Sequence, residues 1–354
     1  MNWTDAIHPP LLTAELPGIG GTIKTEPEDF IVEEIPAYEP CGKGEYLYLW
    51  VEKRSMGAEY FLRQVARRLN IKDQDVGSAG MKDRHAVTRQ RISVPAQVEE
   101  RLPDLEGDGI RVLEVNRHTN KLKTGHLHGN RFTILIRSPE SADCDSAVSA
   151  ILDRIRKQGM PNFYGTQRFG RDGDTAQHGM LLLRDEPAPK GVNLRNPFFR
   201  KLALSAVQSA LFNVYLSQRL QDDLLGKVLA GDVMCKWPAG GMFVAEDVDA
   251  EQKRFDAREI VTAGPIFGKK TFRAHAIAAE REAKELENAG LTTDAFARFG
   301  KLMSGTRRHN LVYLDDLTHT TETDGVRLKF SLPAGSYATV LLREIMKTDI
   351  GEQE

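Results

Sequence analysis

The sequence predicts an α+β protein, in which a mostly helical region interrupts a domain built from both ends of the chain. Alternation of apolar and polar residues, which is typical of half-buried strands, recurs between residues 22 and 137 and returns after residue 310. The longest helical patterns lie between these two regions, from residue 199 to residue 303. Strands near both ends and helices in the middle therefore indicate an insertion.

Changes in composition predict where the inserted region begins and ends. Residues 159–173 are rich in Gly, Asn and aromatic residues, and a Pro-rich connection follows them. We expect one domain to comprise residues 1–158 and 306–354, with residues 159–305 forming the inserted domain. Insertions of this kind are tolerated because the termini of a domain often lie close together.

Strand and helix signals alternate in the first part of the chain. Residues 45–53 alternate aromatic and aliphatic side chains on two faces, which predicts a strand. Residues 58–69 place Phe61, Leu62, Val65 and Leu69 at helical spacing. Further strands are expected at residues 22–25, 30–34, 91–94, 110–116 and 131–137, and a helix at residues 145–157.

Long helical patterns dominate the middle of the chain. Helices are expected at residues 199–220, 273–288 and 294–303, whereas residues 226–270 contain many Gly, Pro and acidic residues and are expected to be irregular. Strands are expected again at residues 310–314 and 326–332. A last helix should begin near Ser336, with Ser336 as its N-cap.

The composition excludes several classes of protein. No apolar run approaches the roughly 20 residues that cross a bilayer. The first 16 residues lack the basic start of a signal peptide. Cys41, Cys144 and Cys235 lie far apart, so neither a disulfide framework nor a zinc cluster is indicated. We expect a cytoplasmic protein without a membrane segment.

Charge is distributed unevenly although the net charge is only -2. Residues 63–91 contain eight Lys and Arg against three acids, and residues 111–137 contain six against one. A basic face of this kind can bind phosphates, and it can equally be a set of solvated helix faces.

Residues 77–91 carry the most informative motif. Small residues allow close approach of the chain to a ligand, and Asp83 then lies between Lys82 and Arg84, with His85 next. Cations that point into the same space would favour the ionised carboxylate, which can act as a nucleophile or base. On the residues alone, a salt bridge in a loop remains the alternative.

The segment Gly80-Met-Lys-Asp-Arg-His-Ala-Val-Thr88 resembles the catalytic motif of the TruD pseudouridine synthases. Five further segments resemble the same family in the expected order, so the likeness extends from about residue 20 to residue 347. They are residues 24–30, 118–125, 129–132, 161–170 and 332–339. The resemblance implies a pseudouridine-synthase-like catalytic domain with a mixed or antiparallel sheet and an inserted TRUD domain.

The resemblance also implies the reaction. Members of the family isomerise uridine to pseudouridine in tRNA, classically uridine 13, without a cofactor. Asp83 would be the essential carboxylate, attacking C1' or removing the C2' proton. The partner would be tRNA, and we expect a monomer. Because the target base must leave its stack, the site needs an aromatic pocket and groups that bind the base edge.

Five residues are assigned to the substrate pocket by the same resemblance. Phe30 could stack on the uracil, Asn130 could bind its edge, and Phe330 could close the pocket. Lys24 is expected nearby as a cation, with Phe132 supporting the pocket from behind. On the residues alone, the phenylalanines fit a core and Asn130 fits a turn equally well.

Other residues are expected to contact RNA. The candidates near the motif are Lys82, Arg84 and His85. Arg168 lies in a segment where aromatics alternate with Arg, a pattern that can stack on bases and bind phosphates or can simply join two domains. Arg308 marks the return to the first domain and could line an RNA cleft.

Two alternatives remain beside the RNA isomerase. One is a tRNA-binding or folding protein without catalysis, and the other is a nucleosidase, although no second carboxylate stands out for it. Members of the wider family also modify other RNAs. His126 and His128 lack nearby Cys or acidic partners, so no metal site is expected.

Overall fold

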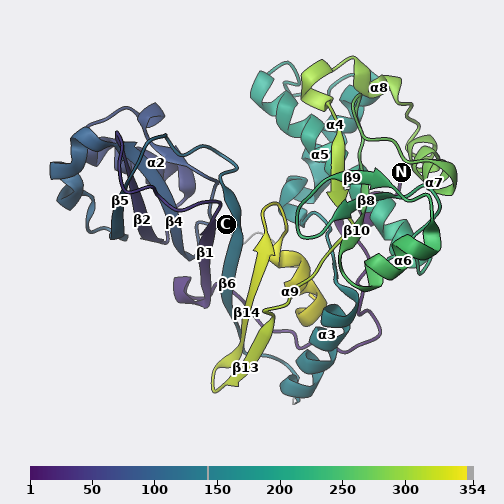
Figure 1. Ribbon diagram of the computed structural model, residues 1–354, viewed down its shortest axis with the longest axis horizontal. Helices are drawn as coiled ribbons and strands as arrows, with labels where there is room; N and C mark the ends of the chain where they lie inside the picture. Colours follow the sequence, from purple (N-terminus) through teal and green to yellow (C-terminus); the bar gives the residue numbers. More distant parts are fainter. Residues whose placement is uncertain (142, 349–354) are drawn as a thin grey trace.

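A computed structural model describes residues 1–141 and 143–348 of the chain. Its largest sheet has eight strands, in the order β13-β14-β6-β1-β4-β2-β5 with β3 paired to β4 (Figure 1). Neighbouring strands run antiparallel, except that β1 and β4 are parallel. The strands are β1 (Phe30–Pro36), β2 (Tyr46–Arg54), β3 (Gly77–Ser78), β4 (Val87–Pro95), β5 (Ile110–His118), β6 (Leu127–Arg137), β13 (Thr318–Glu322) and β14 (Gly325–Pro333).

Pairing of β6 with β14 joins distant parts of the chain, because Asn130 lies opposite Leu332 and Phe132 opposite Phe330. The expectation of a mixed-sheet α+β fold, with sheet strands from both ends of the chain, is thereby confirmed. The predicted domain boundaries themselves stay a prediction.

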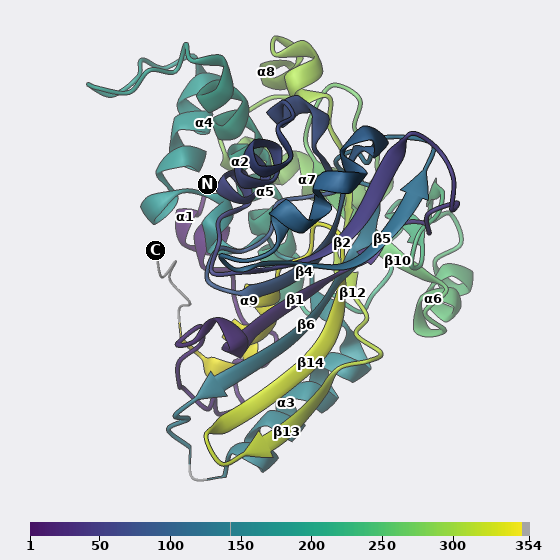
Figure 2. The ribbon, with the colours of Figure 1, turned by 90° about the vertical axis from the view of Figure 1, so that its left-hand side faces the viewer.

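Three of the described helices cover this large sheet (Figure 2). Helix α2 (Ala58–Leu69) buries Phe61 and Val65 against Leu47, Leu49 and other residues of β2 and β4, as its spacing predicts. Helices α3 (Cys144–Gln158) and α9 (Ala338–Met346) pack with β6 and β14 in a second core. Burial of these apolar faces holds the helices on the sheet.

The middle of the chain forms a second lobe around a four-stranded sheet, β11-β10-β8-β9. Its strands are β8 (Val233–Lys236), β9 (Met242–Val244), β10 (Ile260–Ile266) and β11 (Thr306–His309). Its helices are α4 (Asp174–Arg184), α5 (Pro197–Gln221), α6 (Val248–Asp256), α7 (Ala276–Asn288) and α8 (Asp294–Ala297). No described helix is long and apolar enough to cross a membrane.

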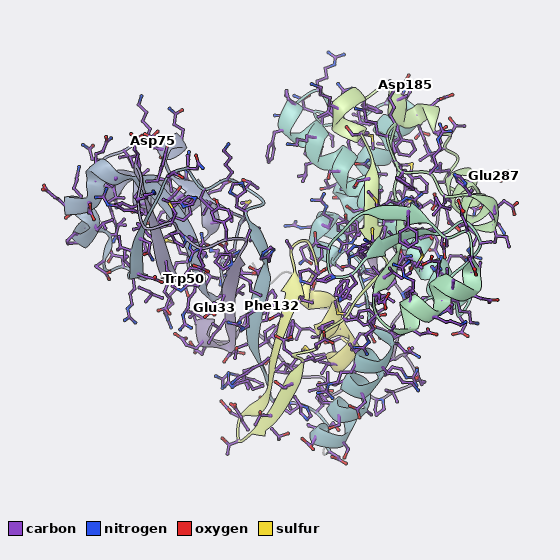
Figure 3. All side chains as sticks on the ribbon, in the orientation of Figure 1. Glu33, Trp50, Asp75, Phe132, Asp185 and Glu287 are labelled. Atoms are coloured by element: carbon purple, nitrogen blue, oxygen red, sulfur yellow. The ribbon has the colours of Figure 1, made fainter. Side chains whose placement is uncertain are left out.

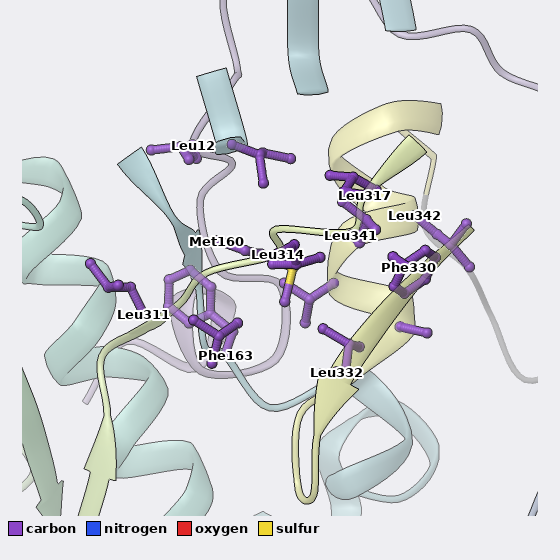
Figure 4. Close-up of a cluster of buried hydrophobic side chains, with 14 of the residues drawn as sticks. Leu12, Met160, Phe163, Leu311, Leu314, Leu317, Phe330, Leu332, Leu341 and Leu342 are labelled. Atoms are coloured by element: carbon purple, nitrogen blue, oxygen red, sulfur yellow. The ribbon is translucent and has the colours of Figure 1, made fainter. Parts of the chain in front are cut away.

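Apolar packing and one further strand pair connect the lobes. Strands β7 (Met160–Pro161) and β12 (Leu311–Val312) pair at the junction. Figure 4 shows Met160, Phe163 and Leu311 in the same buried cluster as Leu332 of β14 and Leu341 of α9. The N-terminal helix α1 (Trp3–Ile7) also packs on α5, and the Asn213 side chain donates to the Ala6 carbonyl.

Several local predictions were wrong. Residues 226–270 contain β8, β9, α6 and β10. Strands β8 and β9 are too short to show a clear period, and β10 is buried at six successive residues, so it does not alternate. Residues 22–25 form no strand, only an isolated bridge between Thr22 and Arg137. The last helix begins at Ala338, because Ser336 turns its hydroxyl to Asn162 instead of capping. The predicted helix at residues 294–303 is divided into α8 and a short 3-10 turn at Gly300–Met303.

Candidate active site

A cavity of about 1040 Å³ opens where β1, β6, the loop before β4 and the start of α9 meet. Eight residues singled out in the sequence line it: Lys24, Phe30, Lys82, Asp83, Arg84, His85, Asn130 and Phe132. They come from three separate segments of the sequence, so the fold gathers most of the predicted site around one space. Phe330, Arg168 and Arg308 do not line the cavity.

Asp83 lies in the loop between β3 and β4, and a buried lysine holds that loop in place. The Lys53 ammonium donates to the carbonyl oxygens of Met56, at 2.5 Å, and Asp83, at 2.7 Å. Lys53 is wholly buried, and its burial lowers the pKa of the ammonium to about 8. The backbone of Asp83 is therefore fixed from inside the sheet.

Sequence analysis missed Lys53, although the sequence contained a signal for it. Leu47, Leu49 and Val51 alternate onto the buried face of β2, and Lys53 continues the same alternation. A lysine at an inward position of a strand requires polar partners, and the loop carbonyls provide them.

The cation that contacts the Asp83 carboxylate is Lys24, at 3.0 Å from Oδ1. Lys24 has a positive φ of 59°, and its ammonium lies 4.4 Å from the centre of the Phe30 ring. The Asp83 side chain keeps 42% of its surface exposed, so the carboxylate is accessible from the cavity. The sequence neighbours of Asp83 were expected to supply this charge, and the structure assigns the contact to Lys24 instead.

Lys82 points away from Asp83 and organises another wall of the cavity. Its buried ammonium lies 3.0 Å from Glu34 Oε2 and donates to Asn130 Oδ1 at 2.8 Å. The Asn130 carbonyl is thus occupied, and its NH2 group is left to donate to a molecule in the cavity. Because the Lys82 ammonium is engaged inside the protein, its contact with RNA stays a prediction that the geometry does not favour.

Two aromatic rings, Phe30 and Phe132, form the apolar wall, and a third, Phe330, packs against Phe132. Phe30 meets Phe132 edge to face at 6.2 Å, and Phe132 stacks on Phe330 at 5.2 Å. Phe132, on β6 (Figure 3), lines the cavity, whereas Phe330 is 1% exposed and lies behind it. The two were expected in the opposite order, because alternation along a strand does not show which ring is nearer the opening.

The two remaining candidate residues of the motif, Arg84 and His85, differ in exposure. Arg84 is exposed at the cavity. His85 also lines it, and its buried Nε2 has no hydrogen-bond partner among the described residues. Both side chains are placed where an incoming ligand could meet them.

Arg168 and Arg308 pack between the lobes. Arg308 donates to the backbone and side-chain oxygens of Asn162 and lies 4.0 Å above the Tyr164 ring. Burial lowers the pKa of Arg308. Arg168 donates to the hydroxyls of Ser205 and Ser209 on α5. These contacts give both arginines a structural role, and their predicted binding of RNA is not tested.

The arrangement suits a planar, uncharged ring beside a reactive carboxylate. Phe30 and Phe132 contribute apolar ring surface to the wall, Asn130 offers a donor, and Asp83 offers two acceptor oxygens held beside one cation. In the part of the chain that the structure describes, no group of three or more His, Cys, Asp or Glu side chains is placed to hold a metal ion.

Comparison with known proteins shows similarity along nearly the whole chain. Residues 7–194 and 190–345 match the family described as tRNA pseudouridine synthase D (TruD). A tRNA pseudouridine synthase D of Anaeromyxobacter dehalogenans is 44% identical over 344 residues, covering 96% of this chain and 97% of that protein. Its counterpart in a strain of Thermus thermophilus is 40% identical over 341 residues, covering 96% and 92%.

A solved structure supports the same relationship. The crystal structure of a Methanosarcina mazei protein assigned to tRNA pseudouridine synthase D superimposes with a TM-score of 0.79 at 25% identity. The match covers 98% of this chain and 97% of that one. Similarity in sequence and in fold therefore extends across both lobes.

Proposed function

Because this chain belongs to the TruD family of tRNA pseudouridine synthases, we propose that it isomerises a uridine in tRNA to pseudouridine, with Asp83 as the essential carboxylate. One observation carries the assignment of Asp83. Its carboxylate is exposed in a cavity that also presents a paired cation, two aromatic rings and an amide donor. The enzyme is thus an isomerase, an intramolecular transferase that moves the uracil on its own ribose.

The cavity has room for an extruded nucleotide. Its volume of about 1040 Å³ lies at the upper end of the range for small-molecule sites. A uridine inside a stem must leave its stack to reach Asp83, which costs a few kcal/mol. Contact with the Phe30 and Phe132 rings would replace part of the lost stacking.

In the proposed reaction, Asp83 acts on the ribose, and the aromatic wall of the cavity holds the uracil. The glycosidic C1'–N1 bond breaks, the uracil turns, C5 bonds to C1', and the proton on C5 is lost while N1 gains one. Asp83 either attacks C1' or removes the C2' proton, and the same geometry serves both routes. An apolar ring wall lets the uracil turn, because it holds the base without fixing its polar edge.

Lys24 and Asn130 have separate tasks in this scheme. The Lys24 ammonium, 3.0 Å from Asp83, holds the carboxylate in place between turnovers. Asn130, whose carbonyl is bound by Lys82, would donate to a uracil carbonyl as negative charge develops on the departing base. We place the target at uridine 13 of tRNA, in the cytoplasm, with no cofactor in the reaction.

Mass spectrometry of tRNA after pseudouridine-specific labelling tests the reaction and the position together. Wild-type protein should label one uridine, and Asp83→Asn should lower the rate by at least about 10⁴-fold while keeping tRNA affinity. Turnover by Asp83→Asn at the wild-type rate would remove the carboxylate from its role. Binding of tRNA by the wild type without product would instead indicate a non-catalytic RNA-binding protein, and a label elsewhere another target.

A further inference from the structure

Residues 187–202, which we call the basic arm, comprise most of the connection from α4 to α5 and the first six residues of α5. Figure 2 shows this connection projecting from the body of the second lobe. No Asp or Glu occurs from residue 187 to residue 221, whereas the arm carries Lys190, Arg195, Arg200 and Lys201. An acid-free stretch of this length in a chain with 50 acidic residues concentrates positive charge at one place on the surface.

The cations of the arm are available to a partner. Lys190, Arg195 and Lys201 are exposed, and their side chains make no ion pair with another described residue. Elsewhere many surface arginines are paired, as Arg54 is with Glu28 and Arg327 with Glu322. Unpaired cations keep their full attraction for phosphates.

The basic arm also carries an exposed aromatic ring. Phe198 is 77% exposed, the largest exposure among the large apolar side chains of the described residues. The Asn196 side chain accepts from the backbone NH groups of Phe198 and Phe199, which fixes the ring at the start of α5. A single exposed apolar residue is ordinary, but an exposed ring in a segment that carries four cations matches how proteins bind unpaired nucleic-acid bases.

The patch extends to a second segment of the lobe. The guanidinium groups of Arg200 and Arg298 lie 5.3 Å and 5.1 Å from the centre of the Phe299 ring. Exposed Lys301 and Leu302 follow in the chain. The start of α5 therefore packs against residues 298–302, where Phe299 is buried, Arg298 is paired with Asp185 and Lys301 is an exposed cation.

Helix α5 connects this surface to the cavity. The Ser205 hydroxyl on α5 accepts a hydrogen bond from the Arg168 guanidinium, and Gln167, the residue before Arg168, lines the cavity. Phe198 precedes Ser205 by seven residues, about 10 Å along a helix. One turn of a nucleic-acid double helix spans on the order of 30 Å, so an RNA with one nucleotide in the cavity can reach the arm.

We propose that residues 187–202 bind the RNA substrate at a second place, outside the cavity. Lys190, Arg195, Arg200 and Lys201 bind phosphates, and Phe198 stacks on an unpaired base. The inference rests on the proposed function, because it takes RNA as the partner. It assigns the arm to recognition of the folded RNA beyond the modified nucleotide.

Two sets of exposed residues allow a matched test. The arm variants are Arg195→Gln with Lys201→Gln, and separately Phe198→Ser. The control pair is Lys253→Gln with Lys284→Gln, which removes the same charge from exposed sites on α6 and α7 (Figure 1). The dissociation constant for tRNA is measured against salt concentration for each protein, with circular dichroism to confirm folding.

The charge variant should weaken tRNA binding about tenfold or more at low salt, and its slope of log K against log salt should fall by about one for each cation removed. Phe198→Ser should weaken binding by about tenfold with the slope retained, because stacking does not depend on counterion release. The control pair should behave as wild type.

The inference would be overturned if the arm variants bound tRNA with the same affinity and salt slope as the control pair. This includes the case in which the arm variants and the control pair all bind more weakly than wild type to the same degree. The two proposals fail separately. Weakened binding by the arm variants in a protein that makes no pseudouridine would leave the arm assigned and the isomerase rejected. Normal tRNA binding by the arm variants of an active enzyme would leave the isomerase supported and the RNA-binding role of the arm rejected.

Discussion

Two ion pairs in this molecule illustrate two different uses of charge. Lys24 and Asp83 meet through one contact of 3.0 Å at the cavity, with 21% and 42% of their side chains exposed. Arg219 and Asp232 meet inside the second lobe through two contacts of 2.9 and 2.7 Å, with 1% and 4% exposed. We call Lys24–Asp83 the open pair, because it is partly exposed at the cavity, and Arg219–Asp232 the closed pair, because it is buried.

The closed pair is satisfied from every direction. Arg219 also donates to the carbonyls of Leu224 and Lys227 and to the Tyr215 hydroxyl. Burial acts to lower the pKa of Arg219, but Tyr215 and Asp232 outweigh it and raise the pKa above its usual value. Such a pair fixes the chain around residue 219. In the open pair, the Asp83 carboxylate remains exposed at the cavity.

The comparison predicts the largest loss of stability at the closed pair. Arg219→Met should lower the free energy of unfolding by about 3–5 kcal/mol, because the Asp232 carboxylate is left buried without its partner. Chemical denaturation followed by circular dichroism measures the change. The double variant Arg219→Met with Asp232→Leu should recover part of the loss, and a single variant as stable as wild type would show that the pair is not needed.

Burial of Lys53 is expected to make the free energy of unfolding depend on pH, with an effect between those of the closed pair and the open pair. Its pKa is about 8 in the folded protein against an ordinary 10.5, so between these values the unfolded chain holds a proton that the native state has released. Ionised Lys53 thus lowers stability below pH 8, and stability rises as the pH increases from 8 to 10.5. The full effect is about 3 kcal/mol.

Denaturation curves for the wild type and Lys53→Met over this pH range test that sign. Their difference in unfolding free energy should move in favour of the wild type as the pH rises. A difference that stays constant with pH would mean that Lys53 keeps its ordinary pKa in the folded protein.

The smallest effect on stability is expected at the open pair. Lys24→Met should change the free energy of unfolding by less than about 1 kcal/mol, since half-exposed pairs contribute little. Pseudouridine formation should nevertheless fall by about 10- to 100-fold, because the carboxylate loses its cation. Rates on tRNA and denaturation curves for the same variant decide the matter. A loss of stability as large as that of Arg219→Met would erase the distinction between the pairs.

Regular periodicity explains which parts of the fold could be predicted. Strand β2 and helices α2 and α5 show clear apolar spacing and lie where the sequence places them. Strands β8 and β9 have only four and three residues, with Gly and Pro between them, so no period could develop. Their pairing with each other and with β10 depends on contacts made only in the folded chain.

The candidate site was predictable as a set of residues but not as a set of contacts. The Asp83 motif and its resemblance identified residues that the fold does bring together. The Lys24–Asp83 contact spans 59 residues and depends on a left-handed backbone conformation, which no local pattern encodes. Arg308 shows a different limit. An arginine among aromatic residues can pack against them or bind RNA, and the sequence pattern is the same in both cases.

The position of β14 affects how the enzyme must be made. This strand lies between β13 and β6, and the residues just after it, including Tyr337 and Thr348, complete the cavity wall. During synthesis, β6 leaves the ribosome roughly 190 residues before its partner β14, at Arg137 and Gly325. The nascent chain must therefore carry an unpaired strand edge while the second lobe is made, and the cavity wall is completed only after the residues that follow β14 have been added.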